Sequence, residues 1–313
     1  MSRVTAPGQD YAPAPQADFI LPFDLPLAGL RGRLVRLEAV SSRALEAHAL
    51  PEPAARVAAE ACVLGTLLGS ALKLDGRLTV QTKSSGPLDL VTADYYGAES
   101  DRPAGVRSYA RVDEQRFASL GAAQPSFEAM AGEGVVAITI EPKTGGQRYQ
   151  GIASLAQASI AASAEAYFAQ SEQLPTAIRL AAAPVYAPGK SGSHWVAGGL
   201  MLQAMPDGRV DRDDWDRLAA FLGTVEDFEL VDVSLAAETL LWRLFHEDEV
   251  RVHPAESVAF RCDCDSGRIA AVLRAYGDTE REGLADPDGV IRARCEFCGR
   301  VHEVAAAGLL PRN

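Results

Sequence analysis

Hydrophobic and polar positions follow two periods along the chain, and the change from one to the other marks its elements. Between residues 30 and about 210 the pattern is mixed. The segment "LRGRLVRL", which begins at Leu30, has the alternation of a strand. Pro53 then predicts a helix start, because proline is favoured in the first helical turn. The apolar residues of this predicted helix recur at helical spacing: Val57, Ala61, Leu64, Leu68 and Leu72.

Further strands follow between turn signals. Three are predicted at "RLTVQTK", "LDLVTADYY" and "GVRSYARV", which Gly, Pro and Ser residues separate. The segments "GVVAITIEP" and "QRYQGIA" are typical of a hairpin joined through "KTGG". A helix from about Leu155 should end at "SEQLPT", because Pro175 cannot continue it. Strands at "AIRLAAAPVY" and "HWVAGGLMLQAMP" complete an α+β domain with a large sheet.

The pattern of apolar and charged residues changes at "PDGRVDRDDWDRL". Two amphipathic helices are predicted there, the first on Trp215, Leu218, Ala219 and Leu222, the second on Ala237, Leu240, Leu241 and Leu244. Residues 209–258 hold 13 Asp or Glu against 5 Arg, which is −8 of the total charge of −12. Short helices with narrow apolar stripes get most of their stability from the surface on which they pack. This segment is therefore the natural candidate for a part of the protein that can unfold.

The predicted fold class is therefore α+β, in four segments. Residues 1–18 form a flexible Pro/Ala-rich tail, and residues 19–208 form the mixed α/β core domain with its large sheet. Residues 209–258 are the acidic helical linker, and residues 259–313 form a small C-terminal domain. The last domain has few apolar residues, so it needs a staple in order to fold.

Composition narrows the function. With 48% apolar and 23% charged residues, the chain is typical of a soluble globular protein, and its net charge of −12 disfavours a nucleic-acid partner. The tail lacks the apolar region of a secretory signal. The apolar run from Val57 is interrupted by Glu60, which favours a buried helix over a membrane span. We therefore expect a cytoplasmic protein, where paired cysteines indicate metal or redox chemistry before structural disulfides.

Four of the five cysteines stand in two clips, Cys262-x-Cys264 and Cys295-x-x-Cys298. Residues i and i+2 of an extended strand point to one side, and a tight turn brings the second pair together, with Gly299 free to take a positive φ. Four thiolates suit one tetrahedral Zn²⁺ with no position left for water, so the site is not catalytic. The net charge of −2 would be offset by nearby arginines: Arg261, Arg268, Arg294 and Arg300.

Oxidation is the sharper interpretation of these clips, beside a purely structural zinc ribbon. Disulfides would form within clips or between them. A Cys-x-Cys bridge is strained and easily reduced, because two extended residues span about 7 Å whereas disulfide Cα atoms lie roughly 4.4 to 6.8 Å apart. Zinc in small modules contributes on the order of 10 kcal/mol to folding, so its loss should unfold the C-terminal domain.

The remaining candidates predict no catalysis. Cys62 falls on a small-residue helical stripe and is expected to pack, and His302 is at most a substitute ligand. "APGKSGSH" lacks the first glycine of a phosphate-binding loop, since Pro184 stands in its place. We predict neither an enzyme nor an ATP site. The other histidines form no cluster with an acid and a nucleophile: His48, His194, His246 and His253.

The spacing of Cys-x-Cys, about thirty residues and Cys-x-x-Cys resembles that of the 33-kilodalton heat-shock protein family of bacterial redox-regulated holdase chaperones. Six further segments resemble the same family in the same order, and together they cover nearly everything after residue 19: "GTLLGSALKLDGRLTVQ", "GPLDLVTADYYG", "QRYQGI", "YFAQSEQLPT", "AGGLMLQAMP" and "LFHEDEVRV". The tail has no counterpart. "RVHPAESVAF" places His253 and Pro254 in a stretch expected to be more apolar, which bears on how tightly the linker docks.

The resemblance implies an ATP-independent holdase that is inactive while reduced and zinc-bound. Peroxide or hypochlorite, together with heat, would release zinc and form the bridges Cys262 to Cys264 and Cys295 to Cys298. The C-terminal switch and linker would then unfold, bind unfolding client proteins and favour a homodimer. The candidate client-binding residues are the apolar linker positions Trp215, Leu218, Leu222, Leu240, Leu241 and Leu244.

The alternative is a regulatory or nucleic-acid-binding protein with a structural C-terminal zinc ribbon. Residues 259–313 contain 8 Arg and 9 Asp or Glu, so they offer no basic face for nucleic acid. No membrane partner is expected.

Overall fold

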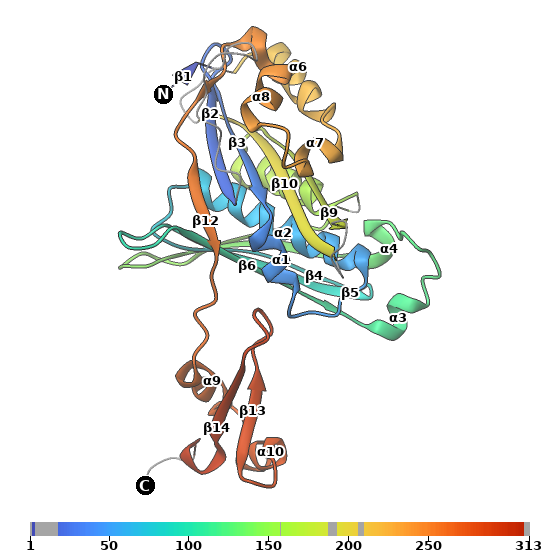
Figure 1. The fold of residues 1–313 in the computed structure, drawn as a ribbon, viewed down its shortest axis with the longest axis vertical. Helices are drawn as coiled ribbons and strands as arrows, with labels where there is room; N and C mark the ends of the chain where they lie inside the picture. Colours follow the sequence, from blue (N-terminus) through green and yellow to red (C-terminus); the bar gives the residue numbers. More distant parts are fainter. Residues whose placement is uncertain (1, 4–17, 157, 187–192, 206–209, 310–313) are drawn as a thin grey trace.

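The chain forms one large sheet with a small C-terminal lobe below it, in a computed structural model that describes residues 2–3, 18–156, 158–186, 193–205 and 210–309 (Figure 1). The strand order is β8-β7-β4-β5-β6-β12-β2-β3-β10-β9, with β11 paired to β2 and β1 to β11. The predicted α+β class is confirmed. The core strands are β1 (Ser2–Arg3), β2 (Phe19–Leu25), β3 (Leu30–Leu37), β4 (Gly76–Ser84), β5 (Leu88–Tyr96), β6 (Ala104–Val112), β7 (Gly134–Pro142), β8 (Tyr149–Ser154), β9 (Thr176–Tyr186), β10 (Ser193–Ala204), β11 (Arg251–Val252) and β12 (Glu256–Phe260).

A long buried helix organises the core. Helix α2 (Glu52–Ala71) packs against strands of both halves of the sheet, among them β5, β6, β9 and β10. Among the described helices, α2 alone is long and apolar enough to cross a membrane, but most of it lies inside the core. The predicted buried helix is thereby confirmed. The remaining core helices are short: α1 (Ala39–Leu45), α3 (Glu114–Ala118), α4 (Phe127–Ala131), α5 (Ile160–Tyr167) and the π-helical turn η1 (Phe168–Glu172).

Strand β12 joins the two halves of the sheet. On one side it pairs antiparallel with β2, where Ser257 lies opposite Phe19. On the other side it pairs parallel with β6, where Phe260 lies opposite Val106. A segment far along the sequence therefore closes a sheet built from the first 204 residues, and Figure 1 shows the C-terminal lobe hanging from its end.

Most predicted elements are confirmed, and one boundary is wrong. The predicted hairpin is β7 with β8, paired antiparallel. The helix expected from about Leu155 begins at Ile160 instead, because the Leu155 N–H still bonds the oxygen of Gly134, the first residue of β7. Ser159 then caps the helix by accepting from the Ala162 N–H. Parts of two predicted segments, the tail (1 and 4–17) and the "APGKSGSH" loop (187–192), lie outside the described residues.

The linker forms three helices over one face of the sheet: α6 (Arg212–Gly223), α7 (Asp227–Val231) and α8 (Ala237–Phe245), followed by the 3₁₀ turn η2 (His246–Asp248) (Figure 1). Both predicted apolar stripes are confirmed. They meet a second hydrophobic cluster built from β2, β3 and β10. Helix α7 was not predicted, because five residues are too few to show a period. The candidate client-binding residues face this cluster: Leu218, Leu222, Leu240 and Leu241 at 0–2% exposure, with Trp215 and Leu244 partly buried.

A buried arginine fixes α7 on the sheet. Arg36 of β3 is 6% exposed and donates to the backbone oxygens of Leu230 at 3.2 Å and Leu235 at 2.8 Å. A third bond reaches the Glu229 oxygen at 3.3 Å. Burial lowers the pKa of Arg36, so the protein holds this cation with carbonyl dipoles at the end of the helix. The linker is therefore attached by specific polar contacts as well as by apolar stripes.

A cavity of about 400 Å³ lies between the linker and the core, and Glu60 of α2 lines it beside Leu222 and Asp227. Burial raises the pKa of Glu60 to about 7, with Arg56 opposing and Asp227 adding to the shift. The docked state therefore binds a proton that the unfolded state has released. Its stability falls as the pH rises from about 4.5 to about 7.

Glu60→Gln should remove this pH dependence. At pH 8 we expect a gain on the order of 1 kcal/mol, or about 2–4 °C in the thermal midpoint, because the amide carries no charge to desolvate. Differential scanning calorimetry of both chains at pH 8 and pH 5 measures it. The pH 5 pair is the control, since Glu60 is protonated there and the two midpoints should converge. An equal difference between the two thermal midpoints at pH 8 and at pH 5 would contradict a raised pKa of Glu60 in the folded protein.

Candidate metal centre

The first clip continues directly from β12. Cys262 and Cys264 lie in the short segment without regular secondary structure between the end of β12 at Phe260 and helix α9 (Ser266–Leu273). The Asp265 side chain caps α9 by accepting from the Arg268 N–H at 2.9 Å. Both sulfurs are therefore held between a strand and a capped helix.

The second clip is a turn between two strands of the C-terminal lobe, β13 (Val290–Arg294) and β14 (Val301–Ala305). The turn closes through Gly299 N–H to Cys295 O and Cys295 N–H to Arg300 O, both at 2.9 Å. Gly299 has φ +72°, so the predicted positive φ is confirmed. The lobe is completed by α10 (Asp278–Leu284) and the 3₁₀ turn η3 (Ala306–Leu309).

The four sulfurs of the two clips converge. Their Sγ atoms all lie within 4.8 Å of one another. Across the clips, Cys262 and Cys295 are 3.7 Å apart, and Cys264 and Cys298 are 3.4 Å apart. A tetrahedral zinc with Zn–S bonds of about 2.3 Å places its sulfurs about 3.8 Å apart. The set fits a metal ion bound by four thiolates, and the two buried members, Cys295 and Cys298, are 8% exposed.

The electrostatics of the cluster also call for a cation. Burial, together with hydrogen bonds from the neighbouring sulfurs, raises the pKa of Cys264. A thiol set crowded in this way ionises when a metal compensates its charge. His302 is 5% exposed, and its Nε2 lies 3.2 Å from the Cys264 sulfur. It therefore contacts the cluster from outside the four-cysteine group.

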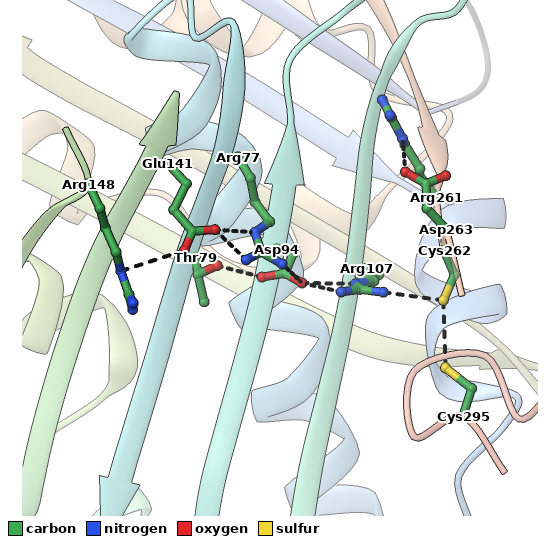
Figure 2. A network of polar contacts seen from close by, with 10 residues as sticks. All are labelled: Arg77, Thr79, Asp94, Arg107, Glu141, Arg148, Arg261, Cys262, Asp263 and Cys295. Carbon is green, nitrogen blue, oxygen red and sulfur yellow. Dashed lines mark hydrogen bonds and ion pairs between the residues drawn. The ribbon is translucent and has the colours of Figure 1, made fainter. Parts of the chain in front are cut away.

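The arginines expected to offset the thiolate charge mostly have other partners. Arg261 is paired with Glu99 and Asp263, Arg268 with Asp265, and Arg294 donates to the Ala47 oxygen. Among the described arginines and lysines, the one with a hydrogen bond to a sulfur is Arg107 of β6, whose Nη1 lies 3.3 Å from Cys262 Sγ (Figure 2). Arg261, Arg268 and Arg294 thus have carboxylate or carbonyl partners, and their contribution to offsetting the thiolate charge stays a prediction.

Comparison with known proteins agrees with this architecture. The family model described as Hsp33 protein matches residues 18–305. The chain belongs to the Hsp33 family. A "33 kDa chaperonin" of Caulobacter vibrioides is 36% identical over 296 residues, 93% of this chain and 96% of the relative. One of Escherichia coli K12 is 37% identical over 270 residues, 86% of each chain.

A solved structure shows the same fold. The 33 kDa chaperonin (heat shock protein 33 homolog) of Thermotoga maritima superposes with a TM-score of 0.74 at 20% identity, covering 93% of this chain and 96% of that one. Membership of Hsp33 makes this chain a relative of chaperones, as the resemblance predicted.

The lobe that carries the cluster touches the core through the second clip. Phe297 lies with its ring centroid 6.1 Å from that of Tyr109 on β6, and the Tyr109 hydroxyl donates to Glu296 at 3.3 Å. The remaining cysteine, Cys62, is fully buried on α2, where burial raises its pKa to about 12. Its predicted packing role is confirmed. Arg107 and Tyr109 were missed by sequence reasoning, and their strand gave no signal beyond alternation.

Proposed function

We propose that this chain is a redox-regulated, ATP-independent holdase that binds unfolded or partly folded client proteins in the cytoplasm and prevents their aggregation under oxidative and heat stress. The names of its relatives support the chaperone activity. The redox control rests on one observation: the four-thiol cluster directly follows β12, the strand that joins the two halves of the sheet. A change at the sulfurs is thus adjacent to the element on which the sheet and the linker depend.

In the reduced state, Cys262, Cys264, Cys295 and Cys298 would hold one Zn²⁺. For each pair, one H₂O₂ would take two electrons from the two thiolates and two protons from water, giving one disulfide and two water molecules. The proposed bridges are Cys262 to Cys264 and Cys295 to Cys298, as the family resemblance implies. The short sulfur contacts run between the clips, and the ion would hold the clips together through four thiolates. Disulfide sulfurs are uncharged, so bridges within the clips would leave no ligands for the ion and let the clips separate. Separation removes the metal site and the staple of the lobe.

Loss of the lobe would release β12 and then the linker helices. Their apolar residues would become the client-binding surface, with Trp215, Leu218, Leu222, Leu240, Leu241 and Leu244 as candidates. In the docked state these six pack on the second hydrophobic cluster, which is why activity requires undocking. Exposed apolar area of this kind also favours a homodimer on activation. The proposal needs neither nucleic acid nor a membrane.

The test follows zinc and client together. Reduced, zinc-loaded protein is treated with peroxide at mildly elevated temperature, while a chromophoric chelator reports zinc release and light scattering reports aggregation of an unfolding enzyme. We expect zinc to leave and aggregation to fall together. Zinc release with unchanged aggregation would sink the chaperone proposal. Retention of zinc under every oxidant would instead favour the structural zinc ribbon.

A further inference from the structure

Arg107 contacts the cluster and the core at once. It lies on β6, and its side chain is 12% exposed. Its Nε and Nη2 donate to Asp94 Oδ2 on β5 at 2.9 and 2.6 Å, while Nη1 donates to Cys262 Sγ at 3.3 Å (Figure 2). Asp94 is 3% exposed and also accepts from the Thr79 hydroxyl at 2.6 Å. The guanidinium is therefore fixed by a buried carboxylate and aimed at a sulfur.

The same guanidinium reaches the second clip. Its central carbon lies 3.8 Å from the centroid of the Phe297 ring, which sits between Cys295 and Cys298. A cation over an aromatic face at this distance is attracted by the ring. The two clips stand about thirty residues apart in sequence, and only their assembly puts both within reach of one side chain. Arg107 thus contacts both clips at once only when the cluster is assembled.

The contact lies at the end of β12. The last pair of that strand is Phe260 with Val106, and the Arg261 N–H bonds the Val106 oxygen at 3.0 Å. Cys262 follows at once, beside Arg107 on the neighbouring strand. Because Cys262 lies two residues after β12, a displacement of Cys262 would also displace the end of that strand. The bond from Arg107 opposes this displacement.

The chemistry of the sulfur decides the strength of this bond. A thiolate accepts a charge-assisted hydrogen bond from a guanidinium, and four thiolates with one Zn²⁺ carry a net charge of −2. A disulfide sulfur is uncharged and is a weak acceptor. Among the described arginines, Arg107 is the only one that donates a hydrogen bond to a cysteine sulfur. Its hold on the cluster should therefore be strong in the reduced state and weak after oxidation.

We propose that Arg107 is the positioning residue that holds the assembled, metal-bearing cluster on β6 and thereby keeps β12 in the sheet. The inference rests on the proposed function for its consequence, since release of this contact is what would pass oxidation of Cys262 to the sheet and linker. It concerns the reduced protein directly and can be measured without a client.

Arg107→Gln tests the contact, and Arg111→Gln is its matched control. Arg111 lies on the same strand and also pairs with an aspartate of β5, Asp89, at 2.8 Å. In reduced protein, competition with a chromophoric chelator should show zinc bound 10–100-fold more weakly in R107Q, the range that loss of an outer partner of a metal ligand produces. Hydrogen exchange of residues 256–260 should also rise. R111Q should stay within about twofold of the parent chain.

A double variant separates this contact from simple structural damage. R107Q removes the two closest cationic donors of the buried Asp94 carboxylate and leaves it the Thr79 hydroxyl and Arg77 at 3.9 Å, so Asp94→Asn is added to remove that charge. We expect the double variant to regain thermal stability of the core while zinc binding stays weak. Zinc affinity restored to within twofold of the parent would overturn the proposal, as would equal affinities for R107Q and R111Q. A parent chain whose client protection never responds to oxidant would sink the holdase function instead and leave the zinc result standing.

Discussion

Replacing Cys298 with serine should abolish stable metal binding and unfold the lobe that follows β12. The buried hydrophobic cluster described for this lobe consists of Leu273, Ile291 and Val304, which is far too small to hold about fifty residues. Zinc ligation supplies on the order of 10 kcal/mol in modules of this kind. Zinc content after gel filtration and hydrogen exchange of residues 290–305 measure the two effects. Exchange there should approach that of an unfolded chain, while β4, β5 and α2 remain protected.

Cys62→Ala is the control for this experiment. Cys62 is equally a free cysteine, but it is buried in α2, away from the cluster. The variant should keep one zinc and a protected lobe. If C298S binds zinc as tightly as the parent and keeps β13 and β14 protected, the four-thiol site does not staple the lobe.

The thiol cluster could be predicted because its information is local. The spacing of each clip brings two sulfurs together, and Gly299 marks the turn by its need for a positive φ. The strands from β3 to β10 and the long apolar helix were predicted from alternation and helical recurrence, whereas β2, β11 and β12 were not. The start of α5 was not, because a bond from Leu155 to the oxygen of Gly134 on the neighbouring strand overrode the pattern.

The contacts that tie the cluster to the core could not be read in this way. In "GVRSYARV", Arg107 and Arg111 occupy equivalent positions of one alternating strand, and both pair with an aspartate of β5. Only the parallel pairing of β12 with β6 puts one of them beside Cys262, which is 155 residues further along the chain. The same holds for Arg36, whose three carbonyl partners belong to the linker. Long-range pairing decides which of several similar cations acquires a role.

Gly198→Ala should undock the linker without touching a cysteine. A Cβ at Gly198 of β10 would lie 2.2 Å from the Leu230 carbonyl oxygen of α7, and backbone cannot yield as a side-chain tip can. Overpacking of this kind costs about 1–3 kcal/mol, and moving α7 also breaks its bonds to Arg36. We expect the reduced, zinc-loaded variant to suppress aggregation of an unfolding enzyme without oxidant. Light scattering measures this, with zinc content confirming that the cluster is intact.

Gly223→Ala supplies the matched control. Gly223 ends α6 in the same linker, and a Cβ there meets nothing within 4 Å. That variant should remain inactive until it is oxidised. If G198A does not suppress aggregation, hydrogen exchange at α7 shows whether the linker has moved. Faster exchange at α7 without client protection would show that the position of the linker does not control client binding. Suppression by G198A together with retained zinc would separate the two parts of the proposed switch: the thiol cluster, which would respond to oxidant, and the linker, which would expose the binding surface.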